Sequence, residues 1–272
     1  MNRPAMLALP AVLDDDFIGV FTDIDDTLTT EGAVTADALQ ALAQLKAAGL
    51  HVVPITGRPV GWSEPFAAQW PVDAIVAENG AVALQRNVGS DGGGIHKLYQ
   101  QGAATRRANY ARMQQVAARV LREVPGTALA QDSPGRETDI AIDHSEFTHL
   151  SQAAIDAALR IMREEGMTAT VSSIHINGWF GSHNKLEGAR WIVRTLFGRD
   201  LDAEKARWLF VGDSTNDELM FGFFPTSVGV ANIRRFEAQL VHKPVYVTRG
   251  ERGAGFSEAA QAVLAPRLSL RT

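Results

Sequence analysis

Cysteine is absent from the 272-residue chain, which rules out disulfide bonds and thiolate chemistry. No apolar run approaches the ~20 residues that a membrane-spanning helix requires. The sequence also lacks a basic tail or a Lys/Arg cluster, and its formal net charge is -5. Nucleic acid and membrane are therefore not expected partners, and a cytoplasmic protein is the expectation.

The first sixteen residues hold a short apolar stretch that Pro4 and Pro10 interrupt and three acidic residues close. A secretory signal needs a longer unbroken apolar segment. We therefore expect a frayed lead-in rather than a signal peptide at this end.

Apolar stretches alternate with segments of helical period, which is typical of an α/β fold. Strands are expected at 17–23, 51–56, 72–78, 206–213, 226–231 and 244–248. Helices are expected at 35–48 and 254–264. This order of elements predicts a doubly wound domain around a parallel sheet.

The middle of the chain has another pattern, in which strands outnumber helices. Paired strands are expected within 80–100, around a glycine-rich segment at 88–94. Amphipathic helices near 104–123 and 151–165 are each followed by strand-like segments. Such units are typical of an α+β layer. We expect three consecutive parts: 1–85 as the first part of the core, 86–182 as an inserted domain, and 183–272 as the second part of the core.

The most informative segment is Asp-Ile-Asp-Asp-Thr-Leu-Thr at 23–29, directly after the first core strand. Ligands bind outside the carboxyl ends of strands in an open parallel sheet. Asp23 and Asp25 stand at such an end, where one loop can aim both side chains into the same crevice. Three acids in four residues repel each other, so we expect a cation or positive side chains nearby. Taken alone, the segment is as readily an acidic turn that caps a helix.

Three further core elements carry matching chemistry. Thr56 closes the second strand, and Gly57 and Arg58 follow it with a turn whose free amides suit a phosphoryl oxygen. Lys185 stands near the start of a predicted helix, and a strand ending at Asp213 leads into further polar residues. Each signal has a structural explanation of its own, but four at successive core elements favour one common site.

In this order the motifs resemble those of the haloacid dehalogenase superfamily. The matching residues are Asp23, Asp25 and Thr27 of Asp-x-Asp-x-Thr, then Thr56, Lys185, and the acids Asp213 and Asp217 of Gly-Asp-x-x-Asn-Asp. The insertion after the third strand resembles that of members with a large α/β (C2-type) cap. These include sugar-phosphate, sucrose-phosphate and mannosyl-phosphoglycerate phosphatases, and phosphomannomutases. The resemblance implies a doubly wound parallel-sheet core with an inserted α+β cap at 86–182.

The same resemblance implies a phosphatase with a defined role for each motif residue. Asp23 would attack phosphorus and form an aspartyl-phosphate, and Asp25 would protonate the leaving oxygen and then activate water. Members that displace halide lack the second acid, so Asp25 favours phosphoryl transfer. Magnesium would be the cofactor, held by Asp23, the backbone carbonyl of Asp25, and Asp213. Four more residues would assist: Thr56 and Lys185 as stabilisers of the transferring group, and Asn216 and Asp217 as supporting residues.

A small phosphoester, expected to be a sugar phosphate, is the implied substrate of a monomer or homodimer. Candidate substrate contacts are Gly57 and Arg58 in the core and Arg136 and His175 in the cap, although for Arg136 an exposed strand-edge arginine is the default interpretation. Two other functions stay open: a phosphomutase of the phosphomannomutase type, and a catalytically silent phosphosugar-binding protein.

Overall fold

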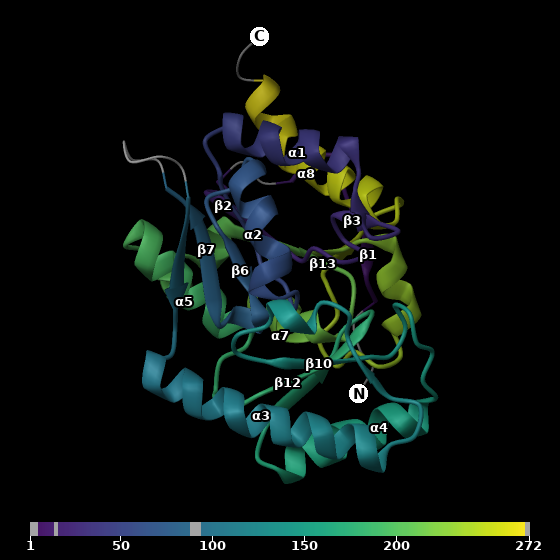
Figure 1. Ribbon diagram of the computed structural model, residues 1–272. Coiled ribbons are helices and arrows are strands. Elements are labelled where there is room, and N and C mark those ends of the chain that lie inside the picture. The colour runs from purple at the N-terminus through teal and green to yellow at the C-terminus, as the bar shows by residue number, and fades with distance from the viewer. Residues whose placement is uncertain (1–4, 14–15, 88–93, 270–272) are drawn as a thin grey trace.

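A six-stranded parallel sheet forms the centre of the computed structural model, which describes residues 5–13, 16–87 and 94–269 (Figure 1). Its strands run in the order β1 (Leu7–Ala8), β15 (Tyr246–Val247), β14 (Ser227–Gly229), β13 (Trp208–Gly212), β2 (Gly19–Thr22) and β5 (His51–Pro54). Strand β2 pairs with β5 on one side and with β13 on the other, and all three strands run parallel. The carboxyl ends of β2 and β13 therefore lie next to each other at the same end of the sheet.

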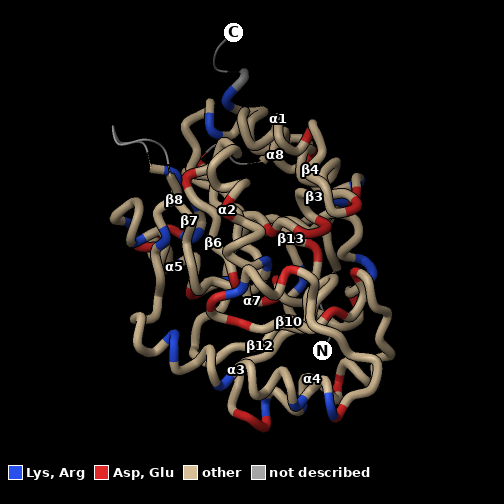
Figure 2. The backbone as a smooth tube through the Cα atoms, viewed as in Figure 1, with Lys and Arg blue, Asp and Glu red and all other residues tan. Residues whose placement is uncertain are grey.

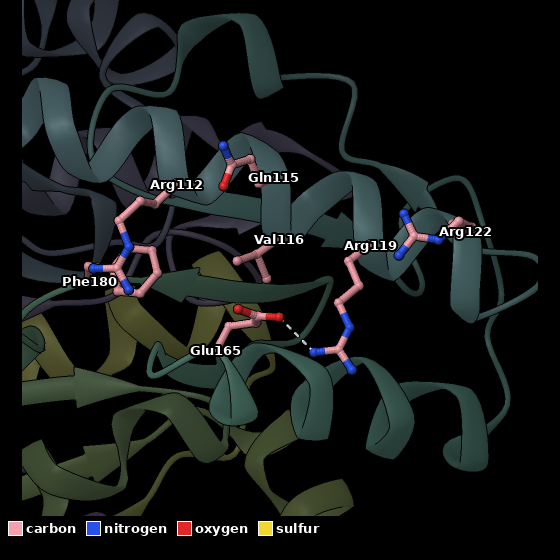
Figure 3. Close-up of a pocket in the computed structure, with 7 residues that line it drawn as sticks. All are labelled: Arg112, Gln115, Val116, Arg119, Arg122, Glu165 and Phe180. Carbon is pink, nitrogen blue, oxygen red and sulfur yellow. Dashed lines mark hydrogen bonds and ion pairs between the residues drawn. The ribbon is translucent and has the colours of Figure 1, made fainter.

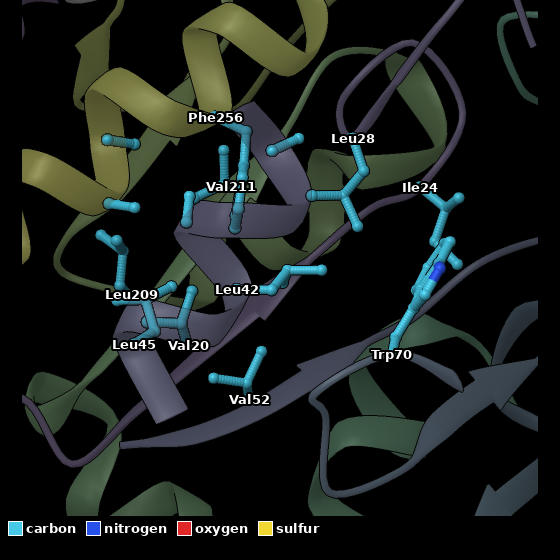
Figure 4. Packing of buried hydrophobic residues seen from close by; sticks show 14 of the residues in the cluster. Val20, Ile24, Leu28, Leu42, Leu45, Val52, Trp70, Leu209, Val211 and Phe256 are labelled. Carbon is cyan, nitrogen blue, oxygen red and sulfur yellow. The ribbon is translucent and has the colours of Figure 1, made fainter. Parts of the chain in front are cut away.

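Helices cover both faces of this sheet because the strand side chains alternate between two apolar layers. Val20 of β2 packs in one layer with helices α1 (Ala36–Ala47) and α8 (Arg252–Ser269), part of which Figure 4 shows. The next residue, Phe21, packs in the opposite layer with α5 (Lys185–Phe197) and α7 (Glu218–Phe223). The predicted doubly wound α/β core is confirmed.

A second, antiparallel set of strands extends the core. Ile55 bridges to Val76, which brings β6 (Ile75–Ala77) beside β5, and β7 (Val82–Arg86) and β8 (Ile95–Tyr99) follow as a hairpin. The pairing of β8 with β7 keeps this hairpin with the core sheet, whereas the predicted boundary at residue 86 divides it. Most of the predicted glycine-rich loop lies outside the described residues.

The inserted part of the chain forms a separate four-stranded antiparallel sheet, which we call the cap sheet. Its order is β11 (Thr168–Val171), β12 (His175–Trp179), β10 (Ile140–Asp143) and β9 (Ala128–Leu129). Helices α3 (Ala103–Glu123) and α4 (Gln152–Glu164) lie beneath it in Figure 1, and they pack against it in a third apolar layer of the protein. The other face of the cap sheet is turned toward the core, since a Cβ on Gly57 would lie 3.3 Å from Asn177 Oδ1 and the Thr215 hydroxyl donates to the Val171 carbonyl at 3.0 Å. The predicted α+β layer is confirmed, and the division of the chain into domains stays a prediction.

The remaining elements are short apart from one helix. They are α2 (Val60–Gln69), α6 (Leu201–Glu204), β3 (Thr29–Thr30), β4 (Ala33–Val34), and the 3-10 turns Glu78–Gly80, Ser133–Gly135, Lys205–Arg207, Thr215–Asp217 and Ala231–Phe236. No helix in the described ranges is both long and apolar enough to cross a membrane.

The N-terminal segment differs from the expected frayed lead-in. The backbone N–H of Leu7 donates to the Val245 carbonyl at 2.9 Å, and that of Leu9 donates to the Val247 carbonyl at 2.9 Å. These bonds make β1 an edge strand of the core sheet. The expectation was wrong here because the segment is held by backbone pairing, which its broken apolar pattern does not reveal.

Candidate active site

Asp23 follows β2, and its backbone N–H donates to the Val211 carbonyl of the neighbouring strand at 2.9 Å. The parallel register of β2 and β13 brings this residue to the edge at which Asp213 follows β13. The Lys185 ammonium lies 2.9 Å from Asp23 Oδ1 and 2.7 Å from Asp217 Oδ1. All four side chains are buried. Figure 2 shows acidic segments gathered between β13 and β10, where this site lies.

Lys185 is the first residue of α5, and local packing fixes the position of that helix. Asn184 caps the helix by accepting a hydrogen bond from the Glu187 N–H at 2.9 Å. Gly188, in the first turn of α5, lies against Gly80 with the two backbones in contact. A Cβ on Gly188 would lie 2.5 Å from the Gly80 Cα. Two glycines thus allow the approach that puts Lys185 between the carboxylates.

Three carboxylates, of Asp23, Asp213 and Asp217, offer oxygen atoms within 4.8 Å of one another. Burial raises the pKa of Asp23 to about 7, against the opposing effect of Lys185. Burial also raises the pKa of Asp213 well above its usual range, and Asp23 and Asp217 add to this effect. One ammonium facing three buried acids leaves negative charge uncompensated. This all-oxygen donor set therefore fits a hard divalent cation.

The oxygens of Asp213 and Asp217 also bind nearby residues. The Asn232 amide donates to Asp213 Oδ2 at 3.1 Å, and the Thr27 hydroxyl lies 3.5 Å from Asp213 Oδ1. Asp217 Oδ2 accepts from the backbone N–H groups of Asp213 and Ser214 at 3.0 and 3.2 Å. These bonds orient both carboxylates and suit Asp217 to a supporting role.

The Asp25 carboxylate points to Arg58, whose Nε lies 2.9 and 3.0 Å from its two oxygens. Burial raises the pKa of Asp25, and Arg58 opposes the effect. The buried Thr56 hydroxyl accepts from the Arg58 backbone N–H at 3.0 Å. The structure therefore brings Asp25, Thr56 and Arg58 together at the ends of β2 and β5, beside the Asp23 cluster.

The other predicted residues make contacts within the protein. Arg136 is buried, and its guanidinium donates to the Gly57 carbonyl at 3.0 Å and to Asp139 at 2.8 Å. It is thus not an exposed strand-edge arginine, because its guanidinium is buried between the Gly57 carbonyl of the core and Asp139 of the inserted segment. His175 is buried, with Nε2 2.9 Å from Glu146 Oε2. Asn216 accepts a hydrogen bond from the Ser214 hydroxyl at 2.7 Å within its own loop.

Sequence reasoning missed two residues that hold the site together. Asn232 follows β14, and its amide donates both to Asp213 and to the Asp26 carbonyl at 3.0 Å. The strand-end rule that selected Asp213 also applies to β14 and could have found it. Glu78 adopts a left-handed backbone with φ 48° and is buried. Its carboxylate accepts from the N–H groups of Val60 and Glu137 at 3.1 and 2.9 Å, which ties the core to the inserted segment.

A pocket of about 250 Å³ lies elsewhere, on the outer side of the cap between α3 and α4 (Figure 3). Arg119 of α3 and Glu165 after α4 form an ion pair of 2.7 Å there, and Arg112 lies over the Phe180 ring. The residues that line this pocket include none of the predicted site residues. The candidate site lies instead at the carboxyl ends of β2, β5 and β13, where the predicted core residues gather.

Residues 20–92 match the family of haloacid dehalogenase-like hydrolases, and no curated protein is detectably similar to the chain. Among solved structures, the sucrose-phosphatase from Synechocystis in complex with sucrose and phosphate is 14% identical. Its TM-score is 0.63, over 92% of this chain and 97% of that one. The C-terminal domain of trehalose-6-phosphate phosphatase from C. albicans is 15% identical, with a TM-score of 0.66 over 97% and 99% of the two chains. A HAD/COF-like hydrolase from Plasmodium vivax is 16% identical, with a TM-score of 0.67 over 94% and 98%.

At these identities the solved structures establish the fold of the whole chain. The family match adds the segment that contains Asp23, Asp25 and Thr56. Within residues 20–92 the chain is similar to haloacid dehalogenase-like hydrolases, and its overall fold is that of these capped phosphatases and hydrolases. The fold implied by the motifs is thus confirmed, and the family match supports the resemblance for residues 20–92.

Proposed function

We propose that the chain is a magnesium-dependent phosphatase that hydrolyses a small phosphorylated metabolite, a sugar phosphate, through an aspartyl-phosphate. The observation that carries the proposal is the buried contact of Asp23 with Lys185, beside Asp213 and Asp25. This arrangement offers a nucleophile, a cation for the phosphoryl charge and an acid for the leaving group at one edge of the sheet. The similar folds of the sucrose-phosphatase and the trehalose-6-phosphate phosphatase support the choice of a phosphorylated sugar.

The reaction has two halves. In the first, an oxygen of Asp23 attacks phosphorus, the bond to the leaving oxygen breaks, and that oxygen takes a proton from Asp25. In the second, the Asp25 carboxylate takes a proton from water, whose oxygen attacks phosphorus and releases Asp23 and inorganic phosphate. Lys185 and Thr56 stabilise the charge on the oxygens of the transferring group.

Asp23 and Asp213 would hold the metal with the backbone carbonyl of Asp25, and the buried charge described above fits that assignment. When bound, Mg²⁺ would offset the repulsion between the Asp23 carboxylate and the phosphate. Asp217 holds Lys185 at 2.7 Å, and Asn216 braces the same loop. Gly57 and Arg58 border the space in which the phosphoryl group would lie.

A panel of phosphorylated metabolites, with released phosphate as the readout, tests the proposal. We expect Mg²⁺-dependent release from at least one sugar phosphate. Incubation with mannose 1-phosphate separates the two catalytic functions, since a 6-phosphate product in place of free phosphate would identify a mutase. Ligand binding without turnover across the whole panel would instead identify a phosphosugar-binding protein.

A further inference from the structure

Arg58 stands between Asp25 and the inserted segment. While Nε contacts Asp25, the other nitrogens face two acids of that segment: Nη2 lies 2.9 Å from Glu146 Oε1, and Nη1 lies 3.3 Å from Asp132 Oδ2. The Arg58 side chain is only 7% exposed. A guanidinium is a rigid planar fork of donors. Its orientation on Asp25 therefore depends on where Glu146 and Asp132 lie.

Both acids are themselves held by the cap. The second oxygen of Glu146 lies 2.9 Å from His175 Nε2, and its backbone N–H donates to Asp143 Oδ1 at 2.9 Å. Asp132 Oδ1 accepts from Arg136 Nη2 at 3.1 Å. His175 and Asp143 belong to strands β12 and β10, so the cap sheet sets the position of Glu146. The position of the cap is thereby coupled to the carboxyl group of Asp25.

We propose that Glu146 and Asp132 are positioning residues that orient Asp25 through Arg58, so that the acid is in place when the cap lies against the core. This rests on the proposed function, in which Asp25 protonates the leaving oxygen. A protonated Asp25 can keep one oxygen on Arg58 Nε and aim its O–H at the substrate. A carboxylate held in the same way faces the attacking water in the second half.

The leaving group distinguishes this role from general support of the fold. As the bond from Asp23 to phosphorus forms, the breaking bond leaves its electron pair on the departing oxygen. A sugar alkoxide needs the proton of Asp25 at that moment, whereas p-nitrophenolate departs without one. A misplaced Asp25 thus slows the hydrolysis of a sugar phosphate much more than that of p-nitrophenyl phosphate. A loosened fold slows both alike.

The experiment measures kcat and KM of Glu146→Gln and Asp132→Asn on both substrates: p-nitrophenyl phosphate, and glucose 6-phosphate or the sugar phosphate that is hydrolysed fastest. We expect Glu146→Gln to lower kcat about tenfold on the sugar phosphate and about threefold or less on p-nitrophenyl phosphate, since general acid catalysis contributes roughly 10²–10⁴-fold in full. Asp132→Asn should change the ratio in the same direction, which keeps the test open if one variant fails to fold. Glu164→Gln is the control, because Glu164 is a cap acid that pairs with Arg119 and Arg160 on the outer surface.

A double variant tests whether Glu146 acts through Arg58. In an Arg58→Ala background, Glu146→Gln should leave the ratio of the two kcat values unchanged. The proposal is overturned if Glu146→Gln lowers kcat equally on both substrates. It is also overturned if Glu146→Gln lowers kcat on the sugar phosphate as much in the Arg58→Ala background as in the wild type. Asp25→Asn separates the two levels of inference. If it changes the ratio and Glu146→Gln does not, only the positioning role fails; if it leaves the ratio unchanged, Asp25 is not the acid, and the proposed mechanism and this inference fail together.

Discussion

Burial gives each charged side chain of the candidate site its chemical character. Asp23, Lys185 and Asp217 lie in a place from which water is excluded, so each charge is sustained by its neighbours. Burial lowers the proton affinity of a lysine, yet the two carboxylates keep the pKa of Lys185 above its usual range. The ammonium is therefore a permanent cation that faces Asp23, the proposed nucleophile.

The first prediction concerns the nucleophile. Asp23→Asn should lower turnover by on the order of 10⁴-fold or more, because an amide neither attacks phosphorus nor binds a cation as a carboxylate does. Lys185 keeps Asp217 as a partner, so the fold should remain. Steady-state phosphate release and the thermal midpoint are the measurements, and Asp16→Asn at the surface is the matched control. Hydrolysis at the wild-type rate would sink the proposed mechanism.

A second prediction follows from His183, which lies between β12 and α5. Its ring is buried, and Nε2 has no hydrogen-bond partner among the described residues. Burial lowers the pKa of His183 to about 4. Because this is below the ordinary value of about 6.5, the unfolded chain takes up a proton first. Burial of the neutral His183 ring therefore contributes its full share of stability above pH ~6.5, and this share is lost as the pH falls from 6.5 toward 4.

Between pH 7.5 and pH 5 the wild type should therefore lose about 2 kcal/mol of unfolding free energy that His183→Phe does not lose. Phenylalanine keeps a ring beside Trp179, which stacks on His183 at 5.4 Å, but cannot be protonated. Urea unfolding of both proteins at the two pH values is the measurement. Parallel losses in the two proteins would show that His183 is charged in the folded state.

At the scale of the elements, parallel strands explain what could be predicted from the sequence. Asp23, Thr56 and Asp213 each follow a strand of one sheet, and such strand ends share an edge. The pairing of Arg58 with Glu146 could not be predicted, because these residues lie 88 positions apart, after strands of two different sheets. Glu78 was equally hidden, since its left-handed backbone and its amide partners arise only from the packing of the core against the inserted segment.

The glycine contact under α5 gives the prediction that belongs to this scale. Gly188→Ala would place a Cβ 2.5 Å from the Gly80 Cα, so the helix must move away and take Lys185 with it. We expect a loss of roughly 1–3 kcal/mol in stability and a fall in kcat of about tenfold or more, since small misplacements of catalytic groups are costly. Urea unfolding and steady-state kinetics measure the two effects.

Gly198→Ala is the matched control for that variant. Gly198 ends the same helix with φ 62° and has open space around its Cα. Alanine there should cost about 1 kcal/mol of backbone strain without moving Lys185. If kcat fell equally in both variants, the contact between Gly188 and Gly80 would not be what positions the lysine.

At the scale of the whole molecule, the proposed cation site joins residues from the two parts of the core. Asp23 precedes the inserted segment and Asp213 follows it, so a bound cation would link the two parts of the core. We predict that EDTA abolishes activity, that Mg²⁺ restores it, and that Ca²⁺ is a poor substitute because the few carboxylates suit a small octahedral ion. Mg²⁺ should also raise the thermal midpoint, since it binds the folded state. Asp213→Asn should remove that rise, and full activity after exhaustive EDTA treatment would contradict the metal assignment.

The last prediction concerns the division of labour between the two sheets. Asp23, Asp25, Lys185 and Asp213 all lie outside the segment 86–182. A core that grips only a phosphoryl group cannot distinguish one leaving group from another, so the inserted segment must supply the contacts to the rest of the substrate. His175 of the cap sheet contacts Glu146, which in turn contacts Arg58 of the core, and this position makes it the first candidate for such a contact.

Replacing 86–182 by the corresponding segment of another capped member should therefore change the ranking of substrates while Mg²⁺-dependent phosphate release persists. Within the native chain, His175→Ala should raise KM for the best substrate, because a contact made equally in the ground and transition states contributes to binding alone. It should lower kcat no more than Glu146→Gln does, since His175 also holds Glu146. Lys185→Ala should instead lower kcat, since the ammonium acts on charge that develops in the transition state. Steady-state kinetics across the substrate panel measures all three proteins. If the exchanged segment left the ranking unchanged, specificity would have to lie in the core, and the residues that follow β5, Gly57 and Arg58, would be the next to vary.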